Sequence, residues 1–64
     1  MQKNMTVQEI KDYLSSELRA AHWQYMDALI EYDKEDPSSI MYKRKAGDLY
    51  YYVTMICNDL GIKE

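Results

Sequence analysis

The sequence predicts an all-α protein, a two-helix antiparallel hairpin that pairs into a homodimeric four-helix bundle. Apolar residues recur at steps of three and four along two stretches, and a segment with the chain's single proline separates them. A connection this short forces long helices to lie antiparallel. A chain of 64 residues is expected to form one domain, spanning residues 1–64, and to bury only about 60% of its unfolded surface. One Cys and one His offer neither an internal disulfide nor a zinc site, so we expect self-association to add stability.

The first helix is expected over about residues 6–34. Thr6 and Glu9 have the spacing of a capping box, in which each side chain satisfies a free backbone N–H of the first turn. Neither Gly nor Pro interrupts the stretch that follows. Its core side is predicted to consist of Ile10, Leu14, Leu18, Ala21, Tyr25, Ala28, Leu29 and Tyr32.

A turn is expected over about residues 35–37, because Pro37 is tolerated in the first turn of a helix and not in its interior. Asp36 is the predicted N-cap of the second helix, with Ser38 as the alternative. That helix is expected over about residues 38–60. Its core side is predicted to consist of Tyr42, Ala46, Leu49, Val53, Ile56, Cys57 and Leu60.

The second helix has a clear stop signal. Gly61 can adopt the left-handed conformation that ends a helix, and Ile62 can then fold back onto the last turn. At the other end of the hairpin, an acidic cluster is expected to lie near a basic one and to offset its charge. The acidic cluster comprises Glu31, Asp33 and Glu35, and the basic one comprises Lys43, Arg44 and Lys45.

Apolar residues also occur on the sides of the helices away from the predicted core. A lone hairpin covers only one side of each helix, so these residues would face water, and an exposed apolar patch usually marks an interaction site. Among three consecutive tyrosines, Tyr50 and Tyr52 are expected to flank the core and Tyr51 to point away from it. The predicted protein interface comprises Trp23, Met26, Ile30, Ile40, Arg44, Tyr51 and Met55.

These features predict a small protein-binding regulator of the inhibitor, antagonist or adaptor type. Seven Tyr, one Trp and five Met are residue types enriched at protein interfaces. In size and helical class the chain is similar to small inhibitors and adaptors of bacteria and their mobile elements, without a shared motif. A nucleic-acid accessory protein using Lys43, Arg44 and Lys45 is the alternative, which the net charge of −3 disfavours.

No catalytic function, cofactor or metal is expected. His22 has no second histidine or Glu-x-x-His partner, so a structural or surface role is predicted for it. Cys57 lies late in its helix beside core residues, where a thiol behaves as a small apolar side chain. The N-terminal residues lack the apolar segment of a signal peptide, and no apolar run is long enough to span a membrane. We therefore expect a cytoplasmic protein.

Overall fold

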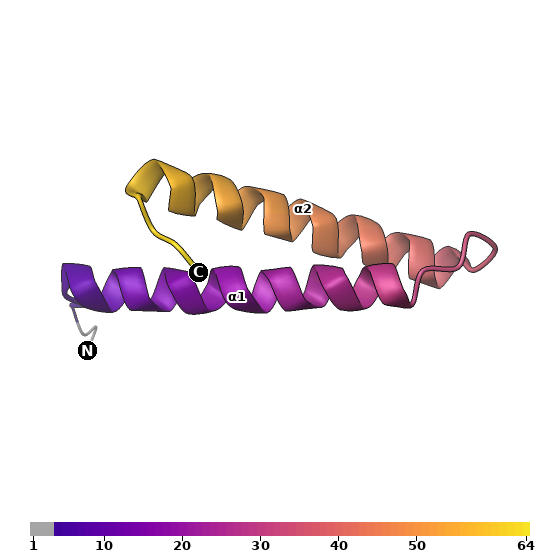
Figure 1. The fold of residues 1–64 in the computed structure, drawn as a ribbon, viewed down its shortest axis with the longest axis horizontal. Coiled ribbons are helices and arrows are strands. Elements are labelled where there is room, and N and C mark those ends of the chain that lie inside the picture. The colour runs from indigo at the N-terminus through magenta and orange to yellow at the C-terminus, as the bar shows by residue number, and fades with distance from the viewer. Residues whose placement is uncertain (1–3) are drawn as a thin grey trace.

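The computed structural model describes residues 4–64, which contain two helices, α1 (Val7–Ile30) and α2 (Pro37–Leu60). The helices run antiparallel and are joined by a short turn (Figure 1). The predicted all-α helical hairpin is therefore confirmed. The molecule is flat, measuring 46 × 28 × 14 Å along its principal axes, so it has two broad faces. Within residues 4–64, neither helix is apolar enough over a sufficient length to cross a membrane.

Helix α1 begins with the predicted capping box. The Thr6 hydroxyl accepts the backbone N–H of Glu9 at 3.1 Å, and the Glu9 carboxylate accepts the backbone N–H of Thr6 at 3.2 Å. These bonds satisfy two N–H groups that have no partner within the helix. The helix ends at Ile30, earlier than the predicted residue 34, because the chain from Glu31 onward is bound into the turn.

Ser39 organises that turn. Its hydroxyl accepts the backbone N–H of Asp33 at 2.9 Å and lies 2.8 Å from the Asp33 carbonyl oxygen, to which it can donate. The side chain of Asp36 accepts the backbone N–H of Ser38 at 3.0 Å, so Asp36 is the N-cap of α2 as predicted. The helix therefore starts at Pro37 rather than at residue 38. Since Ser39 is buried, its hydroxyl has little access to water, and these backbone groups satisfy it.

The chain folds back after α2, as the sequence predicts. Gly61 has φ +70°, and the backbone N–H of Ile62 then donates to the carbonyl of Cys57 at 2.8 Å. The Ser15 hydroxyl holds the returning tail by donating to the carbonyl oxygen of Lys63 at 2.9 Å. This tail connects the end of α2 with the middle of α1 (Figure 1).

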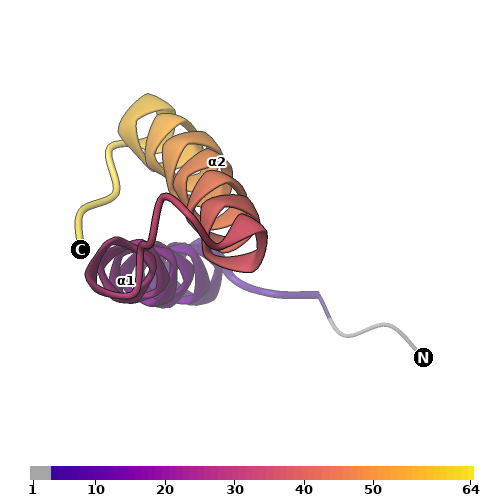
Figure 2. The ribbon, with the colours of Figure 1, turned by 90° about the vertical axis from the view of Figure 1, so that its right-hand side faces the viewer.

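The helices lie close together near the turn and separate toward the end of α2 (Figures 1 and 2). Ile62 is buried at this open end, where it packs with Leu18 and Cys57. Leu14, Tyr50 and Val53 pack around these three residues. The tail therefore supplies apolar contacts that the diverging helices do not make with each other.

Small side chains let the helices approach closely in the middle of the hairpin. Ala21 and Ala28 of α1 and Ala46 of α2 are buried. A Cβ atom added to Gly47 would lie only 3.1 Å from Cε1 of Tyr25. The core is thus well packed but contains few large apolar side chains, so it supplies little hydrophobic free energy.

The predicted core side is partly wrong in both halves of the hairpin. Ser39, Tyr50 and Cys57 mark the side of α2 that faces α1. Because neighbouring helical residues differ in direction by about 100°, Leu49 and Ile56 are turned away from α1. Several residues predicted to form the core are therefore exposed, namely Ile10, Leu29, Tyr32, Leu49, Ile56 and Leu60.

Candidate protein-binding surface

The predicted interface residues all lie in water in the single chain. Trp23 is 71% exposed and Ile30 is 80% exposed, and both belong to the side of α1 that faces away from α2. Exposed side chains of this size are free to contact another protein. The full predicted set, all exposed, is Trp23, Met26, Ile30, Ile40, Arg44, Tyr51 and Met55.

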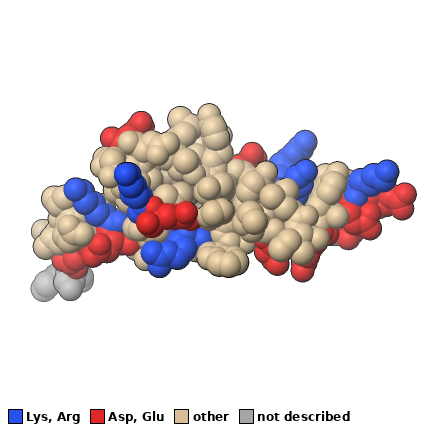
Figure 3. Space-filling model, in the orientation of Figure 1, with Lys and Arg blue, Asp and Glu red and all other residues tan. Residues whose placement is uncertain are grey.

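The face that carries the returning tail, here called the front face, is hollowed between the helices. Two adjoining hollows of about 350 and 500 Å³ share Tyr25, Gly47 and Asp48 as lining residues. Tyr50 and Tyr51 line the larger hollow. Charged side chains gather mainly toward the ends of this face, and its middle is largely uncharged (Figure 3). The front face is therefore a tyrosine-lined groove with polar margins.

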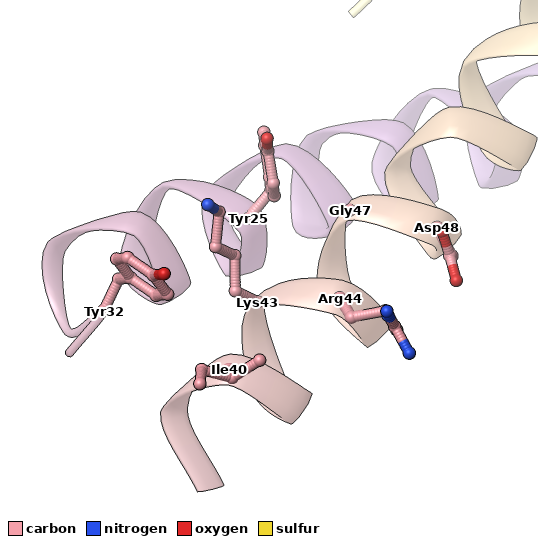
Figure 4. Close-up of a pocket in the computed structure, with 7 residues that line it drawn as sticks. All are labelled: Tyr25, Tyr32, Ile40, Lys43, Arg44, Gly47 and Asp48. Carbon is pink, nitrogen blue, oxygen red and sulfur yellow. The ribbon is translucent and has the colours of Figure 1, made fainter. Parts of the chain in front are cut away.

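The three basic residues near the turn do not form one charged surface. Lys43 extends toward α1, and its Nζ lies 4.2 Å from the centre of the Tyr32 ring. Arg44 points away from α1 (Figure 4). The acidic and basic clusters near the turn are expected to offset each other, but no ion pair joins them in this described part of the chain. Lys43 instead contacts an aromatic ring. Asp33 accepts the backbone N–H of Glu35 at 2.9 Å.

The three consecutive tyrosines have different neighbours. Tyr50 stacks on His22, with ring centres 5.1 Å apart and planes within 4° of each other. Tyr51 and Tyr52 contact each other edge to face at 5.7 Å. Tyr52 was expected beside the core, but it is 63% exposed, because it lies two residues beyond Tyr50 on the helix.

His22 and Cys57 have structural surroundings. The Nδ1 atom of His22 lies 2.7 Å from a carboxylate oxygen of Glu64, which attaches the end of the tail to α1. Cys57 is completely buried, and its Sγ lies 3.7 Å from the carbonyl oxygen of Leu14. Among residues 4–64, no three side chains of the metal-binding types come together.

A second exposed apolar strip, here called the back stripe, runs along α2 and consists of Leu49, Tyr52, Ile56 and Leu60. These residues recur at steps of three and four, so they share one side of the helix. The sequence pattern predicts three of them, Leu49, Ile56 and Leu60, to lie in the intramolecular core. The spacing correctly indicates that these residues share one side of the helix, but it does not show whether α1 covers that side.

The back stripe borders a hydrogen bond between the two helices. The hydroxyl of Tyr42 donates to the carboxylate of Asp27 at 3.0 Å. This bond raises the pKa of Tyr42 above its ordinary value, and the negative charges of Asp27 and Glu31 raise that pKa further. Tyr42 and the back stripe lie on the same side of α2, the side away from the front groove.

We expect Tyr42 to release its proton at a higher pH than an unperturbed tyrosine. Because the folded state raises this pKa, the stabilising effect of the bond is complete below about pH 10, the ordinary tyrosine value. It is lost as the pH rises through the raised pKa of the folded protein. An ultraviolet absorbance titration of wild type and Tyr42→Phe should show that the variant lacks a tyrosine that ionises above about pH 10. If the tyrosine missing from the variant ionises at or below about pH 10 in wild type, the bond is contradicted.

Comparison with known proteins finds no matching protein family, no similar curated protein and no similar solved structure.

Proposed function

We propose that this hairpin is a protein-binding regulator that assembles into a homodimeric four-helix bundle and binds a second protein through its exposed Tyr, Trp and Met residues. The exposure of large apolar side chains on several sides of a two-helix unit supports this proposal. Trp23 and Ile30 project away from α2, while the back stripe extends along α2. Two helices alone cannot cover these surfaces, and apolar surfaces of this kind favour association.

The composition of the core supports assembly as well. Its most buried residues are Ala28 and Cys57, whose side chains remove little apolar area from water. In a domain of this length a single core rarely supplies more than about 3–5 kcal/mol, so an additional interface would add substantially to its stability. Pairing of two hairpins would double the core and is the simplest closed assembly.

A binding role accounts for the surface residues better than catalysis does. The front hollows are lined by tyrosines and a few charged groups. His22 is occupied by Glu64 and Tyr50, and the thiol of Cys57 has no exposed surface. Neither side chain is placed as a nucleophile or a proton-transfer group would need to be.

The first experiment is the solution mass across a concentration series, measured by light scattering behind a sizing column. We expect a stable multiple of 7.6 kDa, with the dimer favoured. The variant Trp23→Ala with Tyr51→Ala should keep its helical circular dichroism, because both side chains are mostly exposed. When immobilised, this variant should fail to retain a protein that immobilised wild type retains. Retention of the same proteins by both baits would contradict a binding role for these residues.

The nucleic-acid alternative is distinguished by a salt series. A nucleic-acid binder would be retained on DNA with a steep dependence on salt, and reversal of the charges of Lys43, Arg44 and Lys45 would abolish that retention. We expect no such retention, because Lys43 is directed onto Tyr32 and the chain is acidic.

A further inference from the structure

The back stripe belongs to a face with an uneven distribution of charge. Tyr42 and Asp27 are joined on this back face, so helical spacing identifies the residues that share it. On α2 the back face is apolar apart from Lys45. On α1 and its C-cap the charged residues of this face are all acidic, namely Glu9, Glu17 and Asp27 in the helix and Glu31 at the C-cap. One edge of the face is therefore acidic, and the other is apolar with one cation.

We infer that a second copy of the chain covers the back face, with α1 of each subunit lying against α2 of the other. This inference rests on the proposed self-association and names the surface that performs it. A two-fold axis parallel to the helices places the acidic edge of α1 against the apolar edge of the partner's α2. An axis perpendicular to the helices would instead place two acidic edges together, and like charges oppose association.

The contacts inside the hairpin fix the register of this arrangement. Gly47 lies beside Tyr25 and Cys57 lies beside Leu14. An axis parallel to the helices repeats the same register between the subunits. Asp27 is then level with Lys45 of the partner subunit, and Ala20 is level with Tyr52 of the partner subunit. The pairs are complementary, because opposite charges face each other and a small side chain leaves room for a large one.

The front face is less suited to self-association. The tail occupies part of it through Ser15 and His22. In the dimer that we infer, the front groove stays open to a different protein. The two halves of the proposed function thus use opposite faces of the hairpin.

Two matched variants test which face pairs. Leu49→Glu with Ile56→Glu adds two charges to the back face, and Met26→Glu with Tyr51→Glu adds two charges to exposed positions outside it. We expect the back-face variant to raise the dimer dissociation constant about 100-fold or more, and the other variant to remain dimeric. If only the other variant dissociates, the inferred face is wrong although self-association stands. A monomeric wild type at every concentration would overturn self-association itself.

Cysteine crosslinking tests the register and does not depend on the back-face variant folding. Chains carrying Ala20→Cys are mixed with chains carrying Tyr52→Cys and are oxidised, and wild type with its buried Cys57 is the control. We expect disulfide-linked dimers between the two kinds of chain and little crosslinking within either kind, because a disulfide needs Cβ atoms about 4 Å apart. The arrangement would be overturned if disulfides formed only between two chains carrying the same substitution, or if the mixture formed no disulfide-linked dimers.

Discussion

Cys57→Asp should unfold the hairpin at neutral pH. Cys57 is 0% exposed and packs between Leu18 of α1 and Ile62 of the tail. A carboxylate at this position would lose its hydration without gaining an ion-pair partner, and such a change costs several kcal/mol. Small domains have a total stability near the lower end of the range of about 5–15 kcal/mol. The substitution therefore removes most or all of it.

Far-ultraviolet circular dichroism measures this effect, and Leu49→Asp is the matched control. It adds the same charge to the same helix, but Leu49 is 48% exposed in the single chain, so its carboxylate is hydrated once the subunits separate. We expect Leu49→Asp to keep most of its helical signal, whereas the sequence pattern alone predicts that it unfolds. A Cys57→Asp protein with the wild-type melting temperature would show that Cys57 is not at the centre of the core.

Ile62→Ala should cause the second-largest loss of stability, about 2–5 kcal/mol, as is typical when a buried isoleucine is truncated. Ile62 is buried at the end where the helices diverge. Its truncation leaves a cavity beside Leu18 and Cys57, where the helices have separated and the tail fills the space between them.

Urea denaturation gives the size of this effect, and Lys63→Ala is the control. Lys63 is exposed and uses only its backbone carbonyl to hold the tail, so its side chain should change the unfolding free energy by less than about 0.5 kcal/mol. Equal midpoints for Ile62→Ala and wild type would mean that the tail does not contribute to the core in solution.

Features of the sequence that act locally predicted the fold well. The capping box of Thr6 and Glu9, the N-cap Asp36 and the stop at Gly61 all depend on residues within a few positions of each other. Their hydrogen bonds follow from local backbone geometry together with the side-chain oxygens of Thr6, Glu9 and Asp36. The antiparallel hairpin then follows from two amphipathic helices and a short connection.

The side of α2 that faces α1 could not be predicted, because it depends on distant contacts. Ser39 binds Asp33, and Tyr50 stacks on His22. These contacts turn α2 so that Leu49 lies beside the core rather than in it. Periodicity shows which residues share a side of a helix, but an apolar side that binds another chain has the same spacing as one that binds its own.

The candidate interface was predicted in part. The exposed Trp23 and Ile30 agree with the expectation that they face outward, whereas the exposure of the back stripe was missed because its spacing is also that of a core. The acidic residues of α1 can be read from the sequence. Only the hydrogen bond between Tyr42 and Asp27 shows that these acidic residues lie on the same face as the back stripe.

The turn around Ser39 also shapes how the chain folds. Each contact between the helices joins residues at similar distances from the turn, as Gly47 and Tyr25 do near it and Cys57 and Leu14 do farther away. Contacts near the turn close short loops and so lose little chain entropy, whereas those at the tail close the longest loops. We therefore expect pairing of the helices to spread outward from Ser39, with the burial of Ile62 as the last step of folding and the first to be undone.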